Sequence, residues 1–423
     1  MILLKNGMVY LSEKRKFDKA DVLIDKKIIK KIAPEIEEKS AEMIDCTGKH
    51  IFPGFVDLHC HLRDPGYSYK EDITTGARSS AKGGFTSICC MPNTKPAIDN
   101  FSTLNYIMRK ARDVHGTKIF VIGAMSKGLE GKEIANIASL VKGGVVALSD
   151  DGNCIQNAKL QLNVMRYASI YGIPLISHSE DYSLSGDGQV NYGYMSTKLG
   201  LPGIPTLAEE IMVSRDIMLA DVTGTHVHIA HASTKRTVEL IRQAKKDGIH
   251  VTAEVTPHHL VLTDEACDGF DTNTKMKPPL RSEEDRKALL EGLLDGTIDA
   301  IATDHAPHSD YEKELQFMNA PFGVIGFESA FPVLYTTFVK NDKIKLEELI
   351  ERMTSKPADI IHKAVGVLKE GAAADLNIFD LGTSFTFNES EILSKSKNSP
   401  FLGMKMWGKI HYTICDGKFT WKI

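Results

Sequence analysis

Eight short apolar segments run through the middle of the chain, and a stretch long enough for a helix separates each segment from the next. Their β-branched and aliphatic residues indicate buried strands. Strands that alternate with helices form a parallel sheet, and eight such units can close into a barrel. The expected strands are 55–58, 86–91, 119–122, 145–148, 174–177, 226–230, 250–255 and 298–303. The sequence therefore predicts an α/β protein with a (β/α)8 TIM-like barrel.

An open doubly wound sheet is the alternative architecture, but no glycine-rich phosphate loop follows the first expected strand. A helix is expected over 207–219, after Pro205. Its apolar residues fall on one stripe that would face the barrel. The stripe consists of Leu207, Ala208, Ile211, Met212, Met218 and Leu219.

The two ends of the chain have a different pattern, with short alternating segments separated by turn residues. Neither end is long enough to bury a sheet well alone. We therefore expect both ends to combine into one small β-sandwich domain. The predicted domains are 1–51 plus 364–423 for this composite β unit and 52–363 for the barrel.

Composition is that of an ordinary soluble protein, with 42% hydrophobic and 25% charged residues among 423. The formal net charge of -4 lacks the basic excess of nucleic-acid-binding proteins, and the lysines of 26–31 fit the solvated side of a strand pair. Seven cysteines without a C-x-x-C pair disfavour disulfides and thiolate zinc sites. No signal-peptide pattern or membrane-length apolar run is present, which predicts a cytoplasmic protein with no membrane partner.

The first expected barrel strand leads into His59-Cys60-His61. Side chains alternate along a strand, so the two histidines project to the same side and could bind one metal ion. An isolated His-x-His is more often part of a surface turn, because such short motifs match by chance. The remaining strand ends decide between these interpretations.

Chemistry in a (β/α)8 barrel lies at the carboxyl ends of the strands. Imidazoles and carboxylates follow five of the expected strands: His59, His61, Asp151, His178, His231 and Asp304. Such a set can hold two divalent ions with a carboxylate between them, and zinc suits it best, although manganese or cobalt could substitute. Coordination lowers the pKa of water from 15.7 to about 7, which supplies a hydroxide nucleophile.

Each of these residues also has a structural explanation when it is taken alone. His178 could be a hydrogen-bonded core histidine, and Asp304 could cap a turn or a helix. His226 and His228 are rivals of His231, because strand alternation does not choose among them. The joint occurrence at five strand ends favours the metal site.

Seven stretches together resemble the class I dihydroorotases of the amidohydrolase superfamily over essentially the whole chain. They are 57–66 (DLHCHLRDPG), 91–94 (MPNT), 149–152 (SDDG), 228–233 (HIAHAS), 277–281 (KPPLR), 304–308 (DHAPH) and 320–326 (APFGVIG). The resemblance implies zinc-dependent, reversible cyclisation of N-carbamoyl-L-aspartate to L-dihydroorotate in pyrimidine biosynthesis.

The resemblance also implies roles for single residues. It places His59, His61 and Asp304 on one zinc and His178 and His231 on the other. Asp151 would lie between the ions, where related hydantoinases have a carboxylated lysine, and its neighbour Asp150 is the alternative. Asp304 would act as general base and then general acid. The implied substrate contacts are His61, Arg63, Asn93, His308, Phe322 and Gly323, and 306–326 is a candidate lid with Gly323 and Gly326 as pivots.

Three positions depart from the family pattern: Lys277 often aligns with asparagine, Asp64 with glutamate, and Cys60 separates the metal histidines. Dihydropyrimidinase or allantoinase activity is one rival, and Arg63 argues against its neutral substrates, since a buried unpaired guanidinium is costly. The other rival is a catalytically silent scaffold, which would not need all six ligands. A homodimer and an association with aspartate transcarbamoylase are further expectations from the resemblance.

Overall fold

The computed structural model describes residues 1–114 and 116–423. Eight parallel strands form one sheet in the order β15-β14-β13-β10-β9-β8-β7-β6. Their bounds are β6 (Phe55–Cys60), β7 (Phe85–Cys90), β8 (Lys118–Ala124), β9 (Ala147–Ser149), β10 (Leu175–Ser177), β13 (Val227–Ile229), β14 (Val251–Val255) and β15 (Ala300–Ile301). Beyond β15, His305 forms a bridge with Cys60, and its carbonyl accepts a hydrogen bond of 2.8 Å from the amide of His61. The predicted eight-stranded barrel is therefore confirmed.

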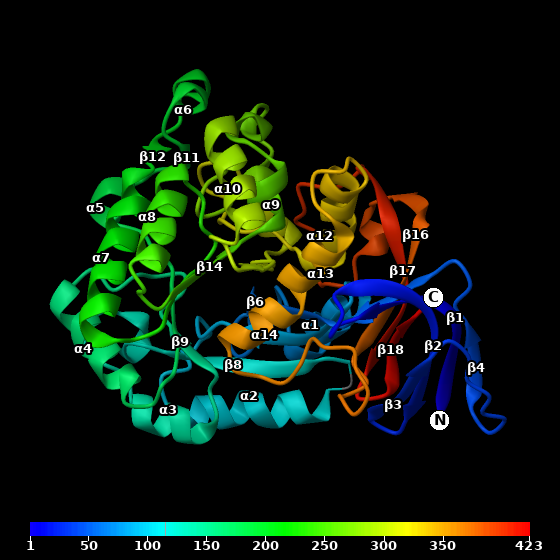
Figure 1. Cartoon of the computed structure of the whole chain (residues 1–423). Helices are drawn as coiled ribbons and strands as arrows, with labels where there is room; N and C mark the ends of the chain where they lie inside the picture. Colours follow the sequence, from blue (N-terminus) through cyan, green and yellow to red (C-terminus); the bar gives the residue numbers. More distant parts are fainter. Residues whose placement is uncertain (115) are drawn as a thin grey trace.

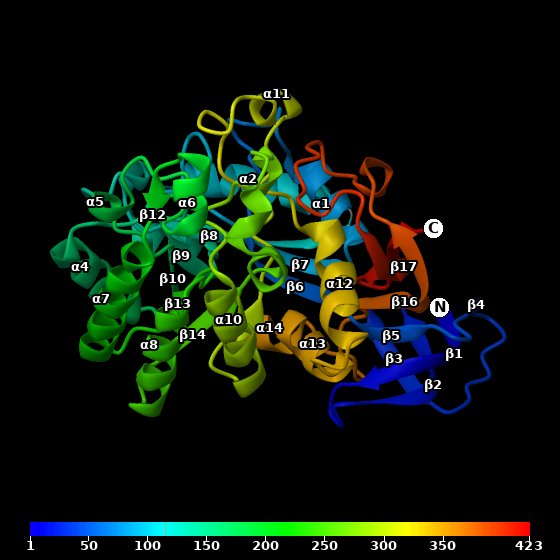
Figure 2. The same ribbon diagram turned by 90° about the horizontal axis from the view of Figure 1, so that it is seen from above.

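Helices surround the barrel, as Figures 1 and 2 show. The longer ones are α1 (Ile73–Lys82), α2 (Phe101–Asp113), α3 (Ile137–Gly143), α4 (Ala158–Ser169), α7 (Leu207–Thr223), α8 (Lys235–Lys246), α10 (Glu283–Asp295), α12 (Phe327–Leu334) and α13 (Leu346–Met353). Short elements near the ends of the strands are α5 (Tyr182–Ser185), β11 (Val190–Asn191), α6 (Tyr194–Leu199), β12 (Gly203–Ile204), α9 (Pro257–Val261), α11 (Asp310–Lys313) and α14 (Ser355–Ile360). Helix α8 is typical, because it buries Val238 and Ile241 and caps its first turn with the Thr234 hydroxyl.

Helix α7 lies where the sequence predicts a helix, but only part of the expected apolar stripe faces the barrel: Ala208 and Met212 are buried. Three of its members are 47–66% exposed: Leu207, Ile211 and Met218. The buried side also contains two carboxylates, because Ser233 N donates to Glu209 (3.0 Å) and Ser177 Oγ donates to Asp216 (2.6 Å). These polar contacts join the helix to the ends of β10 and β13, so apolar periodicity identified only part of its inner face.

Both ends of the chain join in a second sheet, as predicted. Its order is β18-β17-β16-β5-β1-β2-β3, with β4 paired to β1. The strands are β1 (Ile2–Leu11), β2 (Lys16–Asp25), β3 (Ile28–Ala33), β4 (Glu42–Asp45), β5 (His50–Pro53), β16 (Leu376–Thr386), β17 (Lys405–Cys415) and β18 (Lys418–Lys422). Ile29 of β3 and Ile414 of β17 share one buried cluster, so the sheet closes over its own core. Figure 1 shows the two termini beside this sheet.

Four phenylalanine rings join the end sheet to the barrel. Phe52 of β5 stacks on Phe379 of β16 with ring centroids 5.1 Å apart. Phe331 of α12 lies 4.6 Å from Phe379 and 5.3 Å from Phe55 of β6. All four are buried, and large aromatic side chains dominate the energy of such contacts.

All seven cysteines are buried and free, as the composition predicts. Within 1–114 and 116–423, no helix is both long and apolar enough to span a bilayer.

Candidate metal centre and substrate pocket

The carboxyl ends of five barrel strands bring six predicted ligands together. His59 belongs to β6 and His61 follows it directly, while His178 directly follows β10. Asp151, His231 and Asp304 lie within three residues of the ends of β9, β13 and β15. All six side chains are buried: His59, His61, Asp151, His178, His231 and Asp304.

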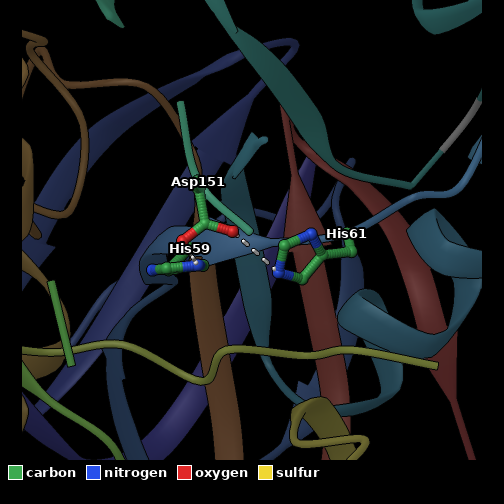
Figure 3. Close-up of side chains that lie close together, drawn as sticks. All are labelled: His59, His61 and Asp151. Atoms are coloured by element: carbon green, nitrogen blue, oxygen red, sulfur yellow. Dashed lines mark ion pairs between the residues drawn. The ribbon is translucent and has the colours of Figure 1, made fainter. Parts of the chain in front are cut away.

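The first group consists of His59, His61 and Asp151, whose ligand atoms lie within 4.8 Å of one another. Asp151 Oδ1 is 3.2 Å from His59 Nε2, and Asp151 Oδ2 is 3.5 Å from His61 Nε2. Figure 3 shows the carboxylate between the two imidazoles, which both point toward it. Asp304 borders this group, because its Oδ1 lies 3.1 Å from His61 Nε2.

The second group shares Asp151 with the first. It contains His178 and His231, whose ligand atoms and those of Asp151 again lie within 4.8 Å of one another. His178 Nδ1 and His231 Nε2 each lie 3.6 Å from Asp151 Oδ1 and 2.9 Å from each other. Asp151 is therefore placed to bridge two ions.

The electrostatics of the cluster fit a pair of divalent cations. His59 Nε2 and Asp151 Oδ1 are buried, and neither has a hydrogen-bond partner among the described residues. Burial opposes ionisation of Asp151, yet the imidazoles of His59, His178 and His231 hold its pKa well below the usual range. Ligand atoms left unpaired around an ionised carboxylate are what a bound cation would satisfy, and nitrogen and oxygen donors suit zinc.

Each imidazole of the first group is held from outside by a polar partner. Glu254 of β14 lies 2.9 Å from His59 Nδ1, and Asn93 lies 2.9 Å from His61 Nδ1. Burial opposes ionisation of Glu254, but His228 and His59 lower its pKa to about 2. Such partners fix the orientation of the ring and leave the other nitrogen free for the metal.

The same arrangement recurs in the second group. Glu180 Oε2 lies 3.3 Å from His178 Nε2. Sequence reasoning missed Glu254 and Glu180 as functional residues. A signal for Glu254 existed, because an ionisable residue inside an apolar strand needs a buried partner.

The rivals of the predicted ligands have other roles. His228 Nε2 contacts Glu254 (3.1 Å), and His226 Nε2 contacts Thr252 (2.8 Å), so both histidines lie within the polar contacts of β13 and β14. Asp150 accepts hydrogen bonds from the amides of Met125 (2.8 Å) and Ser126 (3.0 Å). None of the three belongs to either ligand group.

The backbone is strained at three residues of the site. Arg63, His231 and Asp304 have φ angles of 58°, 34° and 46°, in the left-handed region that L side chains rarely adopt. Each follows a barrel strand closely, so a sharp backbone turn directs its side chain across the mouth of the barrel. Strain of this kind concentrates at functional sites, where surrounding contacts must hold it.

A cavity of about 380 Å³ opens above the cluster, within the usual size for a small-molecule site. Its lining includes His61, Arg63, Asn93, Asp151, His178, His231, Lys277, Asp304, His308, Phe322 and Gly323. The structure therefore brings every predicted substrate residue to the same pocket as the metal ligands.

Arg63 and His308 form the polar side of this pocket. Arg63 Nε donates to the carbonyl of Pro307, and Nη2 lies 3.2 Å from His308 Nε2. Burial, and then the charge of Arg63, lower the pKa of His308 well below its usual range, which keeps the imidazole neutral. An arginine held in this way presents a planar fork to a carboxylate.

Gly323 and Lys277 also line the pocket. A Cβ on Gly323, whose φ is +130°, would lie 2.8 Å from Ala306 Cβ, so only glycine fits. Lys277 Nζ lies 2.8 Å from Glu180 Oε1 and 5.2 Å from the centre of the Phe322 ring. The charge of Lys277 is thus compensated by the carboxylate that also holds His178.

Known proteins resemble this chain over its whole length. Residues 48–237 match the family model described as dihydro-orotase-like. A dihydroorotase from Ruminiclostridium cellulolyticum is 49% identical, over 98% of this chain and 97% of its own. A dihydroorotase from Caldicellulosiruptor saccharolyticus is 48% identical, over 100% of this chain and 99% of its own. The chain belongs to the dihydroorotase family.

Solved structures place this member of the dihydroorotase family in a wider fold group. An L-hydantoinase from Arthrobacter aurescens superposes with a TM-score of 0.88 at 25% identity, covering 100% of this chain and 96% of that one. The dihydropyrimidinase from Brevibacillus agri has the same fold, with a TM-score of 0.87 at 23% identity. The match covers 100% of this chain and 95% of that one. The predicted family and fold are both confirmed.

Proposed function

We propose that the protein is a dihydroorotase, which interconverts N-carbamoyl-L-aspartate and L-dihydroorotate. The observation that carries this proposal is that one pocket combines two metal-ligand groups with an arginine fork. The metal-ligand groups suit hydrolysis of a ring amide, and the fork suits a substrate carboxylate. Membership of the dihydroorotase family supports the same activity.

Asp304 is the proposed proton carrier. Burial opposes its ionisation, but His59 and His61 hold its pKa well below the usual range, so it is a carboxylate at neutral pH. In ring opening, Asp304 takes a proton from the attacking water and delivers it to the ring nitrogen as the C–N bond breaks. Ring closure moves the proton in the opposite direction.

Divalent ions, when bound, would polarise the ring carbonyl and acidify water. His59, His61 and Asp304 would hold one ion, His178 and His231 the other, and Asp151 both. Zinc is the proposed metal, with one or two ions per chain, because its preferred nitrogen and oxygen donors match this set.

Arg63 and His308 are proposed to bind the substrate carboxylate, and Asn93, Phe322 and Gly323 to hold the edge of the ring. The position of Arg63 supports this assignment, since its guanidinium borders the cavity and its hydrogen-bond partners among the described residues are neutral, Pro307 O and His308 Nε2. A carboxylate would compensate the partly buried charge. Dihydrouracil and allantoin have no such group.

A cytoplasmic location fits the seven free cysteines. A homodimer and an association with aspartate transcarbamoylase are proposed on the family resemblance alone.

The test is hydrolysis of dihydroorotate by purified protein, with and without added zinc, beside dihydrouracil and allantoin. We expect metal-dependent turnover of dihydroorotate and little of the neutral rings. Asp304→Asn should lower kcat by about 10² to 10⁴. Preference for dihydrouracil would favour the dihydropyrimidinase alternative, and full activity in Asp304→Asn would remove the proposed base. A metal-free, inactive protein would favour a scaffold.

A further inference from the structure

The connection between β16 and β17, residues 387–404, leaves the end sheet and lies against the barrel beside α1 (Figure 2). Ser396 Oγ donates to the carbonyl of Lys70 (2.7 Å), and the hydroxyl of Ser394 donates to Glu71. The amide of Leu393 donates to Glu328 (2.8 Å). These contacts hold the connection at the rim of the barrel, close to the pocket.

Asn398 extends from this connection into the loop that carries the substrate residues. Its Nδ2 donates to the carbonyls of Ala306 (3.2 Å) and Gly323 (3.0 Å). Its Oδ1 accepts a hydrogen bond from the amide of His308 (3.2 Å), and its own carbonyl accepts one from Ile325 (2.9 Å). The side chain is 3% exposed, so it binds the loop and not water.

These bonds connect two arms of the loop that are separate in sequence. One arm contains His308, whose ring contacts Arg63, and the other contains Gly323, whose amide donates to Lys275 O (3.0 Å). Asn398 itself does not line the cavity. Its effect on a ligand must therefore act through His308 and Gly323.

We propose that Asn398 is a positioning residue for substrate binding, which fixes His308 and Gly323 relative to each other and makes the C-terminal connection part of the substrate cradle. The inference rests on the proposed function only for the identity of the ligand. Asparagine suits the place because one side chain supplies two donors and an acceptor. Aspartate has the same shape but lacks the donors.

The test compares Asn398→Asp and the uncharged Asn398→Ala with wild type. Each lost hydrogen bond contributes of the order of 1 kcal/mol. We expect KM for dihydroorotate to rise about tenfold or more, with a smaller change in kcat and unchanged metal content. Ser396→Ala is the matched control, because that hydroxyl holds the same connection through Lys70 O without contacting His308 or Gly323, and its KM should stay at the wild-type value.

Hydrogen exchange of peptides from 306–326 gives a readout that does not depend on the reaction. Exchange should be faster in both Asn398 variants and unchanged in Ser396→Ala. An unchanged KM and exchange rate, or an equal effect of Ser396→Ala, would overturn the proposal. If wild type fails to hydrolyse dihydroorotate, the proposed function falls, and the exchange experiment still decides the role of Asn398.

Discussion

His61 and Asp304 are 243 residues apart in the chain, and His61 Nε2 lies 3.1 Å from Asp304 Oδ1. They meet because the segment after β15 closes the barrel against β6. Thr303 N donates to Asp57 (2.7 Å) at the same seam. Asp304 therefore reaches the first metal group only when the barrel is closed.

Adjacent carboxylates should differ sharply in their effect on metal binding. Asp151→Asn removes the charge shared by both ligand groups, so we expect loss of both ions and of activity. Asp150→Asn should retain the metal, because Asp150 accepts hydrogen bonds from Met125 and Ser126 and belongs to neither ligand group. Burial also raises the pKa of Asp150 to about 6. Metal analysis after dialysis checks both. Equal metal loss in the two variants would contradict the assignment of Asp151.

Arg63→Lys should weaken the binding of dihydroorotate, because an ammonium group does not reproduce the two parallel donors of the guanidinium. We expect kcat/KM to fall roughly tenfold or more, mainly through KM, at unchanged metal content. Arg78→Lys, on the exposed side of α1, is the control. Wild-type kinetics in Arg63→Lys would mean that another group binds the carboxylate.

Glu180 and Glu254 should tune different metal positions. Glu180→Gln removes the charged partner of His178, and Glu254→Gln removes that of His59. Loss of such a partner typically lowers metal affinity about 10- to 100-fold. Competition with a chelator should show that each variant changes one of two dissociation constants, and that the double variant changes both. If Glu180→Gln and Glu254→Gln raised the same dissociation constant, the assignment of the two glutamates to different metal positions would be refuted.

Lys313 should make stability depend on pH. Its ammonium is buried and donates to the carbonyls of Thr272 and Pro321 (2.9 Å each), and burial lowers its pKa to about 7. The unfolded value is about 10.4, so between these limits the unfolded chain binds more protons. The free energy of unfolding should therefore rise with pH, by at most about 1.4 kcal/mol per pH unit.

Lys313→Met removes this contribution. Urea unfolding at pH 7 and pH 9 should show a smaller gain with pH in the variant than in wild type. Lys198→Met is the control, since Lys198 is exposed and pairs with Asp268 at the surface. The same pH slope in Lys313→Met and wild type would show that Lys313 does not titrate in this range.

The strands and the six candidate ligands could be predicted because both depend on local pattern. Apolar runs mark buried strands, and in a barrel the residues after them meet at one end. His59 and His178 were found in this way without any contact being known. The inner face of α7 was predicted only in part, because Glu209 and Asp216 are buried by hydrogen bonds that hydrophobic periodicity does not record.

The barrel, the joining of the chain ends, the family and a candidate set of metal ligands can be inferred from the amino-acid sequence alone. The folded chain was needed to show that Glu254 and Glu180 contact His59 and His178, that Lys277 pairs with Glu180, and that Asn398 reaches the loop of His308. The physical reason is the range of the interactions. Strand formation follows from neighbouring residues, whereas Glu254 contacts His59 across 195 residues, and such a partner is chosen only once the chain has folded.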